Sequence, residues 1–185
     1  ARPRAFRDAG FGVVPPALAL PDSVFFAAPA SPAAPVTAMR VVPAAEYDHF
    51  DAPSTHAFWA TDWKISAQSD RYGYRLSGQA LTLREPIETR SHGIVPGVIQ
   101  VPHSGQPIIQ MRDAQPSGGY PKIGTVIDAD LWRLGQAPIG SSVRFVEVTW
   151  AEAVKALQDV TDWLDEVRRM VALGRTLHKG AGHDQ

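Results

Sequence analysis

The fold is decided between residues 71 and 123 by three segments: Arg71-Tyr72-Gly73-Tyr74-Arg75, Gly97-Val98-Ile99-Gln100-Val101-Pro102, and Gln106-Pro107-Ile108-Ile109 leading into Asp113-Ala114-Gln115-Pro116-Ser117-Gly118-Gly119-Tyr120-Pro121-Lys122. Each segment joins a β-type apolar run to a turn. Gly118-Gly119 is predicted as the sharpest turn, because two residues without Cβ permit positive φ and a close backbone approach. Polar loops set between strands are common places for binding chemistry.

Further short elements are expected on both sides of this stretch. Strands are predicted near residues 39–42, 63–66, 98–101, 108–111, 124–127 and 143–148, and a hairpin joins 73–76 to 80–83 across Ser77-Gly78. Two short helices are predicted at 44–50 and 54–60, with Asp51 and Ser54 as capping residues. A helical turn at 131–134 is predicted to be capped by Asp128 or Asp130. Together these elements predict a mainly antiparallel β domain over residues 38–148.

The last element has a different period. A capping box, Thr149-Trp150-Ala151-Glu152, precedes apolar residues that recur three or four positions apart: Val154, Leu157, Val160, Leu164, Val167 and Val171. This pattern predicts one long amphipathic helix over 149–174, ending near Gly174, and a tail at 175–185. Its apolar stripe is longer than one end of a small barrel requires, so we expect it to pack against another chain or a missing half.

Composition limits the classes of function. The 185 residues carry a net charge of −1 and no cysteine, which indicates neither a nucleic-acid partner nor disulfide or thiolate chemistry. No apolar run is long enough to span a bilayer. Residues 1–37 are rich in Ala and Pro and are predicted to be extended or disordered, as a linker or the remnant of a missing domain. We interpret the chain as a fragment or a processed piece.

Two arginines are candidates for holding an anion. If residues 71–75 are extended, Arg71 and Arg75 share a face on either side of Gly73, and their guanidinium groups suit a carboxylate or phosphate. The alternative interpretation is a pair of surface arginines bonded to nearby carbonyls or carboxylates.

Amide side chains and a carboxylate form a second candidate group, made of Gln100, Gln106, Asp113 and Gln115. Such a group offers donors and acceptors side by side and therefore suits an amide, ureido or lactam ligand. The alternative is stabilisation of turns. The loop Ser117-Gly118-Gly119-Tyr120 could present backbone N–H groups to an anion, or it could be a plain tight turn. We predict that this loop, the amide and carboxylate group and the two arginines line one groove of the domain. The six histidines show no metal-type spacing, and no metal site is assigned.

The same segments resemble a known family. Residues 69–76, 97–102, 105–108 and 113–124 have the order and spacing of the biotin-dependent carboxyltransferase family, which includes the C subunit of 5-oxoprolinase, allophanate hydrolase subunit 2 and the carboxyltransferase domain of urea carboxylase. The resemblance covers about residues 38–155. It implies a cyclophilin-like β-barrel that forms the C-terminal half of a two-domain subunit, acting in the cytoplasm.

The resemblance also implies an activity, the ATP-dependent opening of 5-oxoproline to glutamate, which makes the chain part of a hydrolase. It implies ATP in the assembled complex, allows biotin, and implies a cyclophilin-like partner subunit of the allophanate hydrolase subunit 1 type and a lactam-utilisation subunit. The alternative implied function is a non-catalytic partner-binding module that antagonises a kinase-inhibitor protein. The implied catalytic residues are Gln100, Asp113 and Gln115, and the implied substrate-binding residues are Arg71, Tyr74, Arg75, Gln106, Ser117, Gly118, Gly119 and Tyr120.

The sequence departs from the family pattern in several places. The family's N-terminal half is absent and the implied cleft lies between the halves, so we expect the fragment alone to be inactive. Pro116 and Ser117 stand where two hydroxyl-bearing residues are usual, and Tyr72 stands where Met is common. The helix beyond Leu157 also extends past the family pattern.

Overall fold

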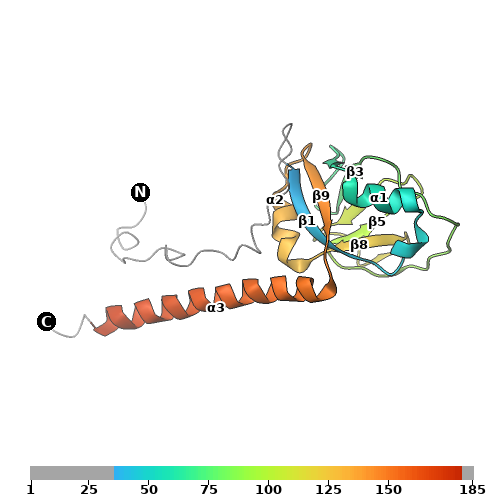
Figure 1. The fold of residues 1–185 in the computed structure, drawn as a ribbon. Coiled ribbons are helices and arrows are strands. Elements are labelled where there is room, and N and C mark those ends of the chain that lie inside the picture. Colours follow the sequence, from blue (N-terminus) through green and yellow to red (C-terminus); the bar gives the residue numbers. More distant parts are fainter. Residues whose placement is uncertain (1–35, 181–185) are drawn as a thin grey trace. The chain divides into compact units, whose positions relative to one another are not determined.

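The computed structural model describes residues 36–180, with side chains as far as Leu173. It is mainly β, and its centre is a closed barrel of seven strands in the order β1-β8-β5-β6-β3-β2-β9 (Figure 1). The barrel strands are β1 (Val36–Pro43), β2 (Trp63–Ile65), β3 (Gly73–Ser77), β5 (Val98–Gln100), β6 (Ile108–Gln110), β8 (Lys122–Val126) and β9 (Ser142–Glu147). Two shorter strands, β4 (His92–Gly93) and β7 (Ser117–Gly118), pair with each other outside the barrel.

Three α-helices accompany the strands: α1 (Ala52–Ala60), α2 (Leu131–Gln136) and α3 (Trp150–Gly180). Two 3-10 turns, η3 (Tyr47–His49) and η4 (Asp128–Asp130), complete the described elements. The chain divides into two compact units, one of residues 26–155 and a second that includes residues 156–180. The prediction of a mainly β barrel followed by a long helix is confirmed. Within the described part, none of the helices is both long enough and apolar enough to cross a membrane.

The barrel closes through one parallel pair, which the prediction of a mainly antiparallel domain did not specify. β1 runs parallel to β9, in register from Val36 with Ser142 to Val41 with Glu147, whereas the other six neighbouring pairs are antiparallel. These two strands lie at opposite ends of the domain sequence, so no turn between them reveals their relative direction.

The predicted hairpin from 73–76 to 80–83 is wrong. β3 pairs with β2 and β6, and the 80–83 segment contributes only a single bridge, between Leu83 and Phe50. At Gly78 the chain passes against Trp63, where a Cβ would lie 2.7 Å from the indole. The Gly78 backbone is then held by Gln106, whose amide accepts from its N–H at 3.0 Å and donates to its carbonyl at 3.2 Å. With these contacts the chain continues away from β3 and does not turn back at Gly78 to form the predicted hairpin.

The helix starts depend on individual side chains. Asp51 caps α1 by accepting from the Ser54 N–H at 2.7 Å, as predicted, but the 44–50 helix is reduced to the η3 turn. Asp130 occupies the N-cap position of α2 without making a cap bond, and η4 has no side-chain cap either, so the predicted capping of this turn is wrong. The capping box of α3 is confirmed, because Glu152 N–H donates to Thr149 Oγ1 at 3.2 Å and Thr149 N–H donates to Glu152 Oε2 at 2.7 Å.

The two ends of the described region also differ from the predictions. α3 continues to Gly180, past the predicted end at Gly174 and into the predicted tail. A single glycine costs a helix only about 1 kcal/mol, and the basic residues that follow suit a helix C-terminus. β1 begins at Val36, two residues inside the predicted linker, and the rest of that linker lies outside the described residues.

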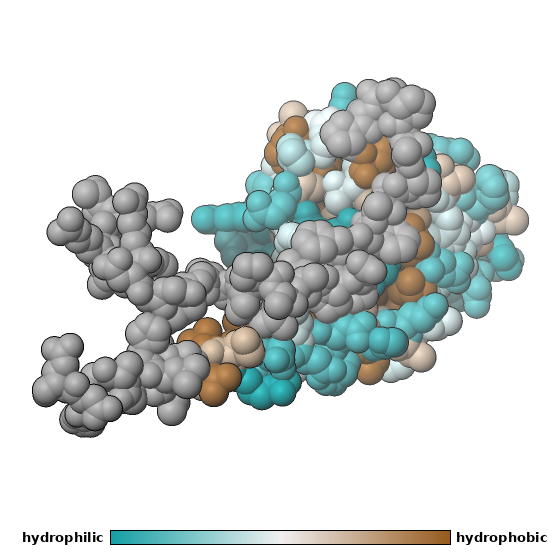
Figure 2. Space-filling model, turned by 60° about the vertical axis from the view of Figure 1, so that its left-hand side comes forward, coloured by the Kyte–Doolittle hydropathy of each residue, from teal (hydrophilic) through white to brown (hydrophobic). Residues whose placement is uncertain are grey.

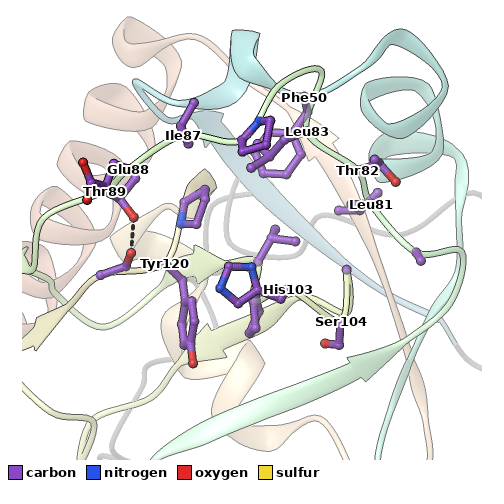
Figure 3. Close-up of a pocket in the computed structure, with 17 residues that line it drawn as sticks. Phe50, Leu81, Thr82, Leu83, Ile87, Glu88, Thr89, His103, Ser104 and Tyr120 are labelled. Atoms are coloured by element: carbon purple, nitrogen blue, oxygen red, sulfur yellow. Dashed lines mark hydrogen bonds between the residues drawn. The ribbon is translucent and has the colours of Figure 1, made fainter.

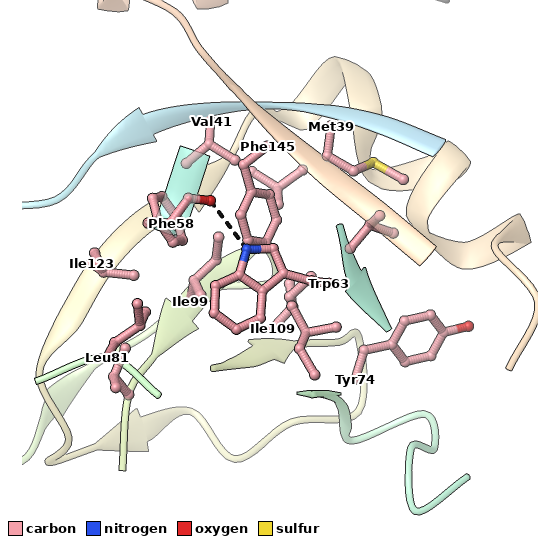
Figure 4. Close-up of a cluster of buried hydrophobic side chains, with 14 of the residues drawn as sticks. Met39, Val41, Phe58, Trp63, Tyr74, Leu81, Ile99, Ile109, Ile123 and Phe145 are labelled. Carbon is pink, nitrogen blue, oxygen red and sulfur yellow. Dashed lines mark hydrogen bonds between the residues drawn. The ribbon is translucent and has the colours of Figure 1, made fainter. Parts of the chain in front are cut away.

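The core lies inside the barrel and is built around Trp63. Its indole is fully buried and donates from Nε1 to the Phe58 carbonyl at 3.1 Å, so the one polar atom of the ring is satisfied (Figure 4). Phe58 of α1 packs on Phe145 of β9, with ring centroids 4.7 Å apart. Burying each such side chain contributes roughly 1.5–3 kcal/mol. On the face shown in Figure 2, hydrophobic residues appear in separate groups among hydrophilic ones.

A buried ion pair fixes β1 to the start of α2. Arg40 donates from Nε to Asp130 Oδ2 at 3.0 Å and from Nη2 to Oδ1 at 2.6 Å, and its backbone N–H also donates to Oδ2 at 2.8 Å. Asp130 is completely buried. This use of the carboxylate explains why Asp130 does not cap the helix that follows it.

Candidate functional site

A cavity of about 550 Å³ lies beside the barrel, between the loop 80–89 and the segments 101–105 and 119–121 (Figure 3). Leu81, Leu83 and Ile87 give one wall an apolar surface. His103 and Tyr120 lie together on another wall, with their rings edge to face and centroids 6.2 Å apart. The cavity therefore offers an apolar wall and polar groups to one small ligand, and its volume is within the usual range for such sites.

The loop that covers this cavity is tied to the opposite segment. The Thr89 hydroxyl donates to the Gly119 carbonyl, drawn as the dashed line in Figure 3. β4 and β7 pair close by, with His92 opposite Gly118. These bonds tie the covering loop and the strand that follows it to residues 117–119.

A second cavity of about 400 Å³ adjoins the first. Pro102, Ser104 and Tyr120 line both, and the second adds Arg75 and Gln106. Arg75 is exposed and has no ion-pair partner among the described residues. Tyr120 therefore stands between an apolar cavity and a cavity with a guanidinium group available for an anion.

Gln100 is buried beneath this region. Its Oε1 accepts from Gln110 Nε2 at 3.1 Å, and its own Nε2 lies 3.5 Å from the Tyr120 carbonyl. Gly118 packs directly on this amide, where a Cβ would lie 2.4 Å from Nε2. Gln100 thus supports the 118–120 backbone from below and does not line either cavity.

The glycine pair differs from its prediction. Gly118 and Gly119 do not adopt positive φ, which occurs among described residues only at Gly97, Gly105 and Gly140. Ser117 and Gly118 form strand β7, so their backbone serves pairing with β4 and does not form an open anion-binding turn. The close backbone approach expected at this pair is present, and Gly118 makes it.

The remaining predicted site residues do not reach the two cavities, so the prediction of a single groove is wrong. Arg71 pairs with Asp113, with Nε 3.0 Å from Oδ2, and both side chains are largely exposed. This is the surface ion pair of the alternative interpretation, because β3 begins only at Gly73 and leaves Arg71 in the preceding bend. Gln115 is exposed, and Tyr74 is a core residue whose hydroxyl donates to the Ala137 carbonyl at 3.3 Å.

The structure adds residues that the sequence pattern did not single out. His103, Ser104 and Glu88 line the first cavity, and His103 could have been found because it directly follows the strand-ending Pro102. Lys122 is buried, with Nζ 3.2 Å from the Tyr120 carbonyl and 3.7 Å from Glu46 Oε1.

The described side chains in this region do not form a set of ligands for a metal ion. Among the described side chains, no three His, Asp or Glu residues are grouped so that they could hold a metal ion.

Comparisons with known proteins agree with this architecture. The chain is 47% identical over 129 residues to the C subunit of 5-oxoprolinase from Escherichia coli K12, an alignment that covers 70% of this chain and 42% of that protein. It is also 47% identical over 133 residues to the corresponding 5-oxoprolinase protein of Haemophilus influenzae, covering 72% and 43%. The chain thus spans less than half the length of these relatives.

A solved structure supports the fold alone. Urea carboxylase of Kluyveromyces lactis superimposes with a TM-score of 0.63 at 21% identity, covering 78% of this chain and 14% of that protein. Residues 14–147 match the family model described as carboxyltransferase domain, subdomain A and B, which includes every strand of the barrel. This chain is therefore a member of the carboxyltransferase domain family.

Proposed function

We propose that this chain contributes part of the substrate-binding surface of an ATP-dependent 5-oxoprolinase, a hydrolase that opens 5-oxoproline to glutamate. The observation that carries the proposal is the 47% identity over 129 residues to a protein named as the C subunit of 5-oxoprolinase. The chain spans 42% of that relative, so the complete activity requires further parts of the enzyme.

The chemistry of the adjoining cavities suits this substrate. 5-Oxoproline has an apolar ring edge, a lactam amide and a carboxylate. In the proposed arrangement the ring lies against Leu81 and Ile87, the lactam lies beside His103 and Tyr120, and the carboxylate is held by Arg75. Charge-assisted bonds to a guanidinium are the strongest polar contacts that the described residues offer there.

The other candidate residues take supporting or interface roles in this proposal. Gln100 positions the backbone of Gly118 and Tyr120, and Gln106 fixes the Gly78 backbone at the edge of the second cavity. The exposed group consists of Arg71, Asp113, Gln115 and Ser117. We propose that this group faces the parts of the enzyme that this chain does not contain, and that any catalytic role of Asp113 or Gln115 is exerted there.

Partners and cofactors follow from the same proposal. A cyclophilin-like subunit of the allophanate hydrolase subunit 1 type and a lactam-utilisation subunit would complete the enzyme, in the cytoplasm. ATP would bind in the assembled complex, and biotin remains a candidate cofactor. Among the described side chains, we assign none to the binding of ATP or biotin.

The test is the activity of this chain assembled with its partner subunits. Glutamate release from 5-oxoproline should require ATP, and the chain alone should be inactive. Urea and allophanate are the competing substrates, and ATP-dependent turnover of either in place of 5-oxoproline would overturn the proposed reaction. An assembled complex inactive on all three would instead favour the non-catalytic partner-binding module.

The location of the site is tested separately. Arg75→Ala should raise the KM for 5-oxoproline roughly tenfold or more, because a charge-assisted bond contributes about 1.5–3 kcal/mol and 1.4 kcal/mol is tenfold. Arg112→Ala is the matched control, since Arg112 is exposed and lines neither cavity. Equal KM values in the two variants would show that Arg75 is not part of the site. Such a result would not bear on the proposed reaction.

A further inference from the structure

The long helix α3 carries a regular apolar stripe that the proposed function does not use. From Leu157 onward its members, Leu157, Val160, Leu164, Val167 and Val171, are spaced alternately three and four residues apart. This is the 3.5-residue period of helices that pair along their length, because each turn returns an apolar residue to the same seam. Leu157 and Leu164 are 44% and 40% exposed, so much of their apolar surface remains open to a partner.

Charged and amide residues outside the seam bond to one another within α3. Arg168 pairs with Asp165 at 2.6 Å, Arg169 pairs with Glu166, and Gln158 Nε2 donates to Asp162 Oδ1 at 2.7 Å. These bonds join neighbouring turns and stabilise the helix modestly. The helix therefore has a polar side and an apolar seam, in which Leu157 and Leu164 are exposed and the valines are half-buried.

The charges along α3 are divided between its two ends. Five acidic residues and one lysine lie in 150–166: Glu152, Asp159, Asp162, Asp165, Glu166 and Lys155. The part from 167 to 180 has no acidic residue and contains Arg168, Arg169, Arg175 and Lys179. This division complements the helix dipole, but the dipole alone does not account for the apolar seam.

We propose that α3 pairs with α3 of a second copy of this chain in an antiparallel, two-fold symmetric arrangement. An antiparallel pair sets the acidic part of each helix against the basic part of the other, whereas a parallel pair would set like charges together. The two-fold axis passes midway between Leu164 and Val167. Leu164 then packs on Val167 of the second copy, and Val160 packs on its Val171.

The pairing predicts a dimer of the full chain. Sedimentation over a dilution series should show a monomer–dimer equilibrium, and Leu164→Glu should weaken it at least tenfold by placing a charge in the apolar seam. Gln158→Glu adds the same charge on the polar side and is the matched control. A monomer at every concentration would overturn the proposal. It would instead favour packing of the apolar seam against the remaining residues of this chain or against another subunit.

The direction of pairing is tested by cross-linking, because the chain has no cysteine of its own. Val160→Cys and Val171→Cys chains, mixed and oxidised, should form a mixed disulfide in the antiparallel pair. Within one helix these positions are roughly 16 Å apart, so each variant alone should cross-link poorly, since a disulfide needs Cα atoms within about 7 Å. Efficient cross-linking of each variant to itself would show a parallel pair and overturn the proposal.

Discussion

Gly118→Ala tests whether the glycine pair is required for close packing. A Cβ at residue 118 would lie 2.4 Å from Gln100 Nε2 and 3.0 Å from its Oε1, where ordinary contacts begin at 3.4 Å. The Gln100 amide would have to move by about 1 Å, judged from that shortfall against normal packing distance. It is buried, so a move of this size breaks its bond to Gln110 without giving access to water.

The expected loss follows from these contacts. Leaving a buried amide without its partner costs about 1–3 kcal/mol, which lowers Tm by about 4–12 °C for a domain of this size. Thermal unfolding of the full chain, followed by near-UV circular dichroism, measures this loss. Gly119→Ala is the matched control, because the one tight contact of its Cβ would be with the Ser91 Oγ at 3.1 Å, the end of an exposed side chain.

A double-mutant cycle with Gln100→Ala isolates the contact. In the Gln100→Ala background the alanine at 118 has space, so Gly118→Ala should cost little there. The reasoning is refuted if Gly118→Ala is as stable as Gly119→Ala, or if it costs the same with and without the Gln100 side chain.

Two further predictions concern the stability of the barrel and of α1. Asp130→Ala should destabilise the barrel by about 3–5 kcal/mol in urea unfolding, because it leaves Arg40 buried and charged. Replacing Arg40 by Met and Asp130 by Leu together should recover most of that loss. A double variant as unstable as the single one would contradict this. Bonds from Ser54 lower the pKa of Asp51 below its ordinary 3.8, so its stabilisation of α1 is present above that pH and is lost as pH falls through the lowered pKa. The Tm deficit of Asp51→Asn should therefore shrink toward pH 2, and a deficit independent of pH would exclude the charged cap.

The sequence by itself determined the elements whose signals are local. The Thr149–Glu152 capping box specifies where α3 begins, because it acts within one helical turn. The period of the apolar residues that follow predicts the helix itself. The Asp51 cap of α1 and the strands around Val98 and Ile108 follow from equally local patterns. The resemblance to the carboxyltransferase family was also contained in short segments of the sequence, at residues 69–76, 97–102, 105–108 and 113–124.

Only the tertiary structure decided which distant groups meet. Arg71 and Arg75 are four residues apart, yet one pairs with Asp113 on the surface and the other faces the second cavity, because β3 starts between them. The parallel closure of β1 on β9 and the Arg40–Asp130 pair join segments about ninety or more residues apart. Such pairings depend on the packing of the whole barrel and leave no local signal. Gly118 combines both levels, since its sequence predicted a close approach and only the fold supplied the Gln100 amide that it approaches.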